Sequence, residues 1–139
     1  MIVESCQILC SVFYNNSKII PPYKLTHQNH PCCLWARKSS GNFNWLTAHT
    51  RALLAEYTKR YTKTHKSAEI FEWIKKNKSK LFFLEKKRTP FVQAMPEIYQ
   101  TDDAVEAYRN YYIGEKNKFA LWRKSRKPYW FILKEIKEK

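Results

Sequence analysis

Glycine is scarce in this chain of 139 residues, which contains only Gly41 and Gly114. Two isolated glycines cannot form a glycine-rich phosphate-binding loop, and the tight turns of an all-β fold need more of them. The Gly-x-Ser-x-Gly turn of serine hydrolases is also missing, so neither a nucleotide hydrolase nor a serine hydrolase is indicated. Six prolines interrupt the chain instead, which favours helices joined by proline-marked loops.

Long apolar runs are missing as well. No stretch approaches the roughly 18 consecutive apolar residues that a membrane-spanning helix needs. The apolar first segment, Met1–Phe13, contains Glu4 and Gln7 and has no basic start, unlike a secretory signal peptide. We therefore expect no membrane partner and a cytoplasmic location, where the four cysteines would be reduced thiols.

Acidic residues are few, since 26 lysines and arginines face 12 aspartates and glutamates and leave a net charge of +14. The excess peaks in residues 51–88, which carry 12 cations against 4 acids. Such a charge indicates a polyanionic partner, with nucleic acid ahead of an acidic membrane. The alternative is a lysine-rich surface that only keeps the protein in solution.

The apolar spacing predicts an all-α fold, namely a compact single domain over residues 1–139 with four or five helices and irregular proline-marked loops. Trp45, Leu46, Leu53, Leu54, Tyr57 and Tyr61 are expected on the buried side of the long central helix. The expected elements are a helix at Met1–Tyr14, a loop at Asn15–Pro31, a helical turn at Pro31–Arg37, an interruption at Ser39–Asn42, a long helix at Phe43–Thr62, a helix capped by Ser67 and ending in Lys75–Lys80, an irregular segment at Leu81–Gln100, a last helix capped by Asp103 and running to Arg123, and an aromatic end at Lys127–Phe131 that docks on the domain.

The stretch "NHPCCLWARKS", residues 29–39, gathers histidine, cysteine and cations. His27 and His30 are crowded against Cys32-Cys33, and adjacent cysteines rarely bind one tetrahedral ion, so we expect no metal site. A cysteine nucleophile would need a lowered pKa, and buried, inert thiols are the better interpretation. His30 is then a candidate catalytic residue, while Arg37 and Lys38 are candidates for contact with a polyanion.

Two further groups of residues have both a functional and a structural interpretation. Glu56 and Arg60 lie on the same helical stripe as His49. In the structural interpretation they form an i,i+4 ion pair that adds little stability. In the functional interpretation Glu56 acts as a general acid or base beside a polyanion. The second group suits phosphate contact with stacking on a base, or forms a solvated basic edge. Its members are Arg109, Tyr112, Lys116 and Arg123.

Four stretches together resemble a family of small, mostly uncharacterised proteins of tailed bacteriophages, including phages of marine bacteria. They are "MIVESCQILC", "NHPCCLWARKS", "EYTKRY" with "KTH" behind it, and "MPEIYQTDDAVEAYRNYYIGEK" leading to "KPYWF". The resemblance covers most of the chain. Members of that family begin upstream with a strand-like segment and a Cys-Asp-Lys-His stretch, so we expect Met1 to be an internal start, a truncation or the start of a divergent short form.

The chain is also similar, over shorter motifs, to pyrimidine-dimer DNA glycosylases, which are small, basic and all-α. The motifs are "NHPCCLW" before a helix with "AEYTKRY", and the terminal "KPYWF". This resemblance implies attack of an N-terminal amine on the sugar C1′, a Schiff base, a carboxylate early in the first helix and an exposed lesion. Glu4 matches that carboxylate, whereas Met1 does not match the position of the amine.

The sequence thus predicts a phage-encoded DNA-binding protein, related to a repair glycosylase or lyase that acts on a damaged or modified base, with no cofactor. Two alternatives are a non-enzymatic binding protein that modulates a host or phage nucleic-acid enzyme, and a helical enzyme acting on free nucleotides. The candidate catalytic residues are Glu4, His30 and Glu56, and the candidate nucleic-acid-binding residues are Arg37, Lys38, Arg60, Arg109, Tyr112, Lys116 and Arg123.

Overall fold

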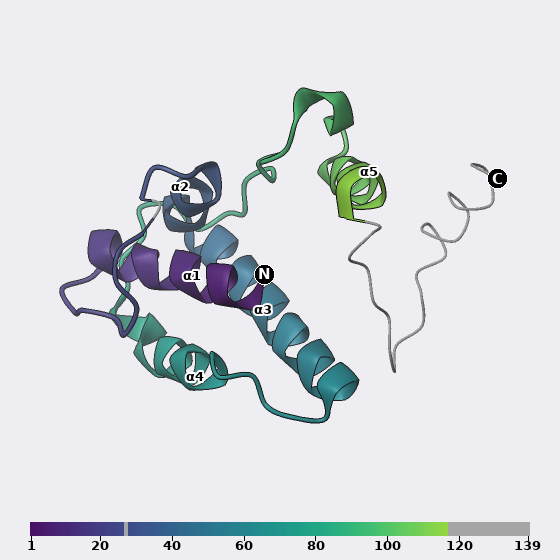
Figure 1. Cartoon of the computed structure of the whole chain (residues 1–139). Coiled ribbons are helices and arrows are strands. Elements are labelled where there is room, and N and C mark those ends of the chain that lie inside the picture. Colours follow the sequence, from purple (N-terminus) through teal and green to yellow (C-terminus); the bar gives the residue numbers. More distant parts are fainter. Residues whose placement is uncertain (27, 117–139) are drawn as a thin grey trace. The chain divides into compact units, whose positions relative to one another are not determined.

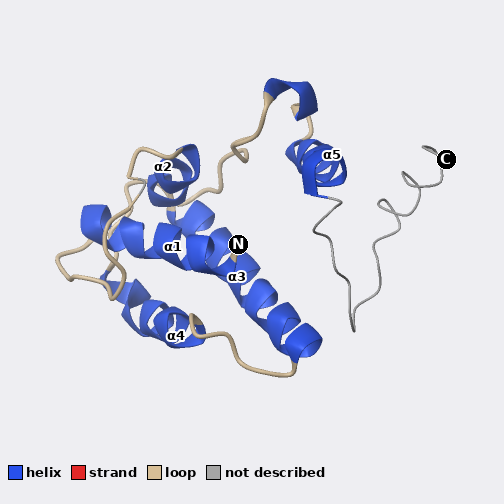
Figure 2. Cartoon of the chain, viewed as in Figure 1, coloured by secondary structure: helices blue, strands red, loops and turns tan. Residues whose placement is uncertain are grey.

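The regular structure of this protein is helical. The computed structural model describes residues 1–26 and 28–116, and the chain divides into two compact units, residues 1–90 and the part that begins at Phe91. Within the described ranges there are five α-helices, two short 3-10 helices and no strand (Figure 2). The all-α prediction is confirmed. A single domain over residues 1–139 stays a prediction, and the aromatic end at residues 127–131 lies outside the described residues.

Helix α1, Ile2–Asn16, lies at the centre of the first unit (Figure 1). It contacts α2 (Pro31–Lys38), α3 (Ser40–Tyr61) and α4 (Ala68–Asn77). The buried ring of Phe13 meets Phe43 and Trp73 edge to face, with ring centroids 6.2 and 4.9 Å apart. The prediction of a first helix over Met1–Tyr14 is therefore confirmed, and its apolar stripe forms the core.

Two tyrosines fasten the loop between α1 and α2. The Tyr14 hydroxyl donates to the backbone carbonyl of Tyr23 at 3.0 Å, and the Tyr23 hydroxyl lies 2.9 Å from the hydroxyl of Ser67. Ser67 precedes α4, but its side chain makes no capping hydrogen bond there. The prediction of a Ser67 side-chain cap is wrong because that hydroxyl is bonded to Tyr23. The helix ends at Asn77 and continues as a 3-10 turn over Lys78–Lys80.

The predicted interruption at Ser39–Asn42 is reduced to one residue. Only Ser39 leaves the helical conformation, and α3 begins at Ser40 rather than Phe43. The Ser39 hydroxyl accepts a hydrogen bond from the backbone N–H of Asn42 at 3.0 Å. A serine that caps a helix satisfies one of its unpaired N–H groups, so this polar run starts a helix instead of separating two.

The buried face of α3 is more polar than the apolar pattern predicted. Thr47 and Thr50 are buried beside Phe43 and Leu46, and their hydroxyls donate to the carbonyls four residues earlier, both at 2.8 Å. These bonds remove the cost of burying the hydroxyls. Two residues expected on the buried side are exposed instead, Trp45 at 38% and Tyr61 at 36%.

Helix α5, Ala104–Lys116, belongs to the second unit. The Asp103 carboxylate accepts from the N–H groups of Val105 at 2.9 Å and Glu106 at 3.4 Å, which confirms the predicted cap. The preceding segment is irregular as predicted, apart from a 3-10 turn at Glu97–Tyr99. The predicted continuation of the last helix to Arg123 lies outside the described residues. In the described part of the chain, no helix combines the length and the apolar character that a membrane span requires.

Candidate nucleic-acid interface

The segment that follows the 3-10 turn at Lys78–Lys80 is hydrogen-bonded to the start of α3. Backbone N–H groups of Ser40 and Gly41 donate to the carbonyls of Glu85 and Lys86, at 3.0 and 2.9 Å. The N–H groups at a helix start often bind anions. Here the first two are directed at backbone oxygens, so the positive end of α3 is occupied and anion attraction must come from side chains.

Gly41 is required for this contact. A Cβ atom at position 41 would lie 2.5 Å from the backbone nitrogen of Arg88 and 2.6 Å from the carbonyl oxygen of Lys86. Both are backbone atoms that cannot rotate away. The absence of a side chain at this position therefore lets residues 85–88 approach α3.

Residues 81–84 are not helical, and their side chains alternate between half-buried and exposed along the chain. The ring of Phe83 lies toward the core, 5.7 Å from the ring of Phe43, and the N–H of Phe82 donates to the Asn16 carbonyl at 2.8 Å. Phe82 and Leu84 consequently face away from the core, with 69% and 90% of their surface exposed. Large apolar side chains held in water by a fixed backbone indicate a contact surface.

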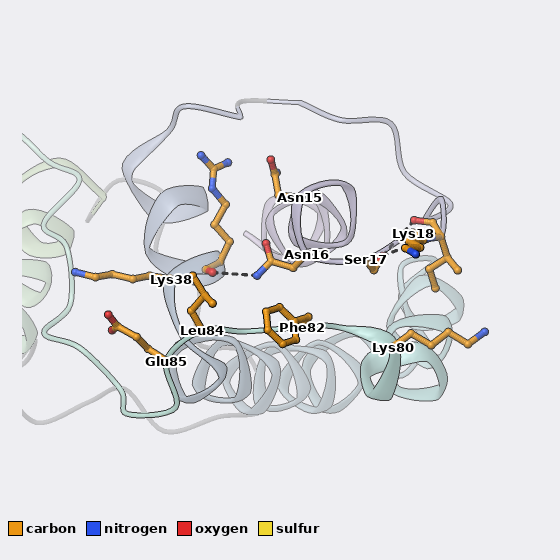
Figure 3. Close-up of a pocket in the computed structure, with 11 residues that line it drawn as sticks. Asn15, Asn16, Ser17, Lys18, Lys38, Lys80, Phe82, Leu84 and Glu85 are labelled. Atoms are coloured by element: carbon orange, nitrogen blue, oxygen red, sulfur yellow. Dashed lines mark hydrogen bonds between the residues drawn. The ribbon is translucent and has the colours of Figure 1, made fainter.

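These two apolar side chains lie in an open hollow of about 1040 Å³. Figure 3 shows Lys38 on one side of them and Lys18 and Lys80 on the other. Arg37 also lines the hollow, together with Glu85. The cations come from the loop after α1, the end of α2 and the 3-10 turn, so only the folded chain brings them together.

The hollow is positive even after the helix ends are counted. Its described lining holds four cations and one acid, or 4 − 1 = +3. Each carboxyl end of a helix carries about −0.5 charge, and the ends of α1 and α2 both face this hollow, which leaves about +2. The amide of Asn16 donates to the Arg37 carbonyl at 3.1 Å, which neutralises part of the α2 end. The Arg37 guanidinium donates to the Gln28 carbonyl at 3.1 Å and is held in place.

Of the candidate residues, Arg37 and Lys38 therefore lie in the hollow. Arg60 lies elsewhere on α3, where its Nε donates to the Glu56 carboxylate at 2.8 Å, which confirms the predicted ion pair. Glu56 is sixteen residues beyond Ser40. At a rise of 1.5 Å per residue, that is about 24 Å along the helix. Glu56 and Arg60 thus belong to a different part of the first unit.

His30 lies at the start of α2. His30 precedes that helix, and its Nδ1 accepts from the N–H of Cys32 at 3.1 Å. The pKa of Cys32 is raised by burial and, to a smaller extent, by the charges of Cys33 and Glu4. Glu4 is therefore within electrostatic reach of this helix start. His30 acts here as a helix cap, a role that leaves its Nε2 available.

Three further candidates belong to α5. Arg109 and Tyr112 are half-buried and lie three residues apart, and Lys116 is the last residue of the helix. Spacings of three and four residues put all three positions on one side of the helix. Arg123 lies outside the described residues.

The cysteines are free thiols, and Cys6, Cys10 and Cys33 are buried. Burial raises the pKa of Cys6 to about 11 and that of Cys10 to about 12, so neither forms the reactive thiolate near neutral pH. The prediction of buried thiols is confirmed at these three positions, whereas Cys32 is half-buried. Among residues 1–26 and 28–116, no three histidine, cysteine or acidic side chains gather in a way that could hold a metal ion.

Sequence reasoning missed four residues of the hollow, Lys18, Lys80, Phe82 and Leu84. A signal was present, because the apolar run at residues 81–84 lies between the charged residues Lys80 and Glu85 and is too short for a helix. Comparison with known protein families, with curated proteins and with solved structures found no match. What this surface binds has to be inferred from the geometry and charge of its own residues.

Proposed function

We propose that this chain is a DNA-binding protein and that the hollow beside Phe82 carries the contact. The supporting observation is that four cations from three separate segments line the same hollow as an exposed aromatic side chain. Lysine and arginine side chains bind phosphates and release the counterions of DNA, so their number sets the salt dependence of the affinity. A phage origin and the cytoplasm of the host cell belong to the same proposal, on the basis of the resemblance.

Salt-dependent binding tests this function. Affinity for a short duplex should fall steeply with salt, and Lys80→Gln should lower the slope of log K against log salt by about 0.9. Lys63→Gln is the matched control, because Lys63 is also exposed and the substitution removes the same charge in the connection between α3 and α4. An absence of binding at low salt, or an equal effect of the two substitutions, would contradict the proposal.

A DNA glycosylase or lyase activity is the second candidate. Its support is that His30 caps α2 and that the charge of Glu4 acts on Cys32 in the first turn of the same helix, since a carboxylate and an imidazole are groups that can take part in proton transfer. The reaction also needs an amine that forms a Schiff base with the sugar. Borohydride trapping on abasic or ultraviolet-damaged DNA should give a covalent adduct that Glu4→Gln weakens. If no adduct forms even when the upstream segment of the resembling phage proteins is fused to this chain, DNA binding stands without the chemistry.

A further inference from the structure

The orientation of Phe82 and Leu84 is fixed by the backbone on both sides. The N–H of Phe82 is bonded to the Asn16 carbonyl, and the carbonyl of Glu85 is bonded to the N–H of Ser40. Between these bonds, Phe83 packs on Phe43. Turning Phe82 inward would break the first bond and remove Phe83 from its contact with Phe43. The two outward side chains are therefore held in place before any ligand arrives.

We propose that the hollow binds single-stranded DNA, with an unpaired base stacked on Phe82 and phosphates held on either side of it. Figure 3 shows the required order, with Lys38 on one side, Phe82 and Leu84 between, and Lys18 and Lys80 on the other. Single-strand-binding proteins combine a basic groove with aromatic rings in this way. This inference rests on the proposed DNA binding and specifies the form of DNA.

Duplex DNA cannot use the aromatic ring of Phe82 in the same manner. The faces of its bases are covered by stacking, and only base edges and phosphates are accessible. A duplex would contact the cations of the hollow and leave the ring in water. An unpaired base instead presents a free face to the ring, so stacking adds to the phosphate contacts only for single strands.

A second copy of this chain is a poor occupant of the same surface. The chain carries a net charge of +14, and the hollow itself has four cations against one acid. Docking two such surfaces would place like charges together, which opposes association. The charge of the hollow thus favours a polyanion over self-association through the apolar pair.

Phe82→Leu separates stacking from simple apolar contact, because leucine keeps an apolar side chain and loses the ring. Anisotropy would be measured with a labelled thymidine oligomer of about 12 nucleotides and with a duplex of the same length. We expect Phe82→Leu to weaken single-strand binding about 5- to 150-fold, the loss of one stacked base, and to leave duplex binding unchanged. Phe82→Trp should retain the single-strand affinity.

Ile20→Ala is the matched control, since Ile20 is 79% exposed and is not a lining residue of the hollow. It should change neither affinity. Phe82 is itself mostly exposed, so thermal melting of the variants should match the wild type.

Three results would overturn the inference. Equal affinity for both DNA forms, with no effect of Phe82→Leu, would leave the proposed DNA binding intact and remove the single-strand assignment. Failure of both DNA forms to bind at low salt would remove the proposed function as well. A dimer in light scattering that Phe82→Ser abolishes would assign the apolar pair to a second copy of the chain.

Discussion

Asn42 and Thr89 exchange two hydrogen bonds across a separation of 47 positions in the sequence. The Asn42 amide nitrogen donates to the Thr89 hydroxyl at 2.9 Å, and its oxygen accepts from the Thr89 N–H at 2.8 Å. The same amide nitrogen also donates to the Trp35 carbonyl at 2.8 Å. One fully buried side chain thereby joins α2, α3 and the segment that carries the hollow.

Replacing Asn42 with alanine should lower the free energy of unfolding by about 2–4 kcal/mol. The substitution removes the three hydrogen bonds of a fully buried side chain, and losing one partner of a buried hydrogen bond costs more than the bond itself contributes. Urea denaturation measures the effect. Asn44→Ala, at an exposed position of the same helix, should change stability by about 0.5 kcal/mol or less. Equal losses of stability in the two variants would show that Asn42 does not hold the segment around Thr89 on α3.

Replacing Gly41 with alanine should destabilise the protein even though Gly41 is inside a helix. Helix propensity alone would make alanine about 1 kcal/mol more stable. The new Cβ atom would meet the backbone of Lys86 and Arg88, and such overpacking typically costs about 1–3 kcal/mol. Ala52→Gly, at an exposed α3 position, tests whether propensity acts normally in this helix. A higher melting temperature for Gly41→Ala would contradict the close approach.

Thiol labelling should distinguish Cys32 from the other cysteines. Cys6, Cys10 and Cys33 are buried, and Cys32 is half-buried with a raised pKa. In the native protein near pH 8 we expect slow labelling of Cys32 alone, since the thiolate is the reactive form. All four thiols should react in denaturant, and Cys32→Ser should abolish native labelling. Rapid native labelling of Cys6 or Cys10 would mean that the core opens readily.

His49 should make stability depend on pH. Its ring stacks on Trp45, with centroids 5.0 Å apart and planes 11° apart, and burial lowers its pKa from the usual 6.5. The unfolded chain, in which His49 keeps its usual pKa of 6.5, therefore binds a proton more readily than the folded protein. The stability that the neutral ring contributes is complete above pH 6.5, and it is lost as the pH falls from 6.5 through the lowered pKa of the folded state.

Urea midpoints at pH 7.5 and at lower pH would measure this effect. His49→Gln should reduce the loss on acidification, since glutamine has no such proton to bind. An identical pH dependence of the variant and the wild type would show that His49 does not contribute to it.

Sequence reasoning succeeded where neighbouring residues decide the structure. The cap at Asp103 and the stripe through Leu9 and Phe13 depend on residues within one or two turns, and both are present. It failed where a distant partner decides. Serine is a residue type that often caps helices, yet the hydroxyl of Ser67 is bonded to Tyr23, 44 positions away.

In the candidate interface, too, residues set by local pattern could be predicted and residues set by distant contacts could not. Arg37 and Lys38 could be selected from their charge and their place beside a helix end. Phe82 could not, because its exposure depends on the bond to Asn16 and on the packing of Phe83 against Phe43. Whether an apolar residue faces the core or water is set by contacts that no local pattern contains.

The attachment of residues 85–89 to the start of α3 has a consequence for the order of events during synthesis. The ribosome completes α1, α2 and α3 long before Thr89 is added, and contacts between distant positions form late because they close long loops. The nascent helices can therefore pack on one another while the hollow does not yet exist. A chain interrupted before this attachment forms would keep many of its lysines and lack the surface that arranges them, so the hollow would arise only when the first unit is complete.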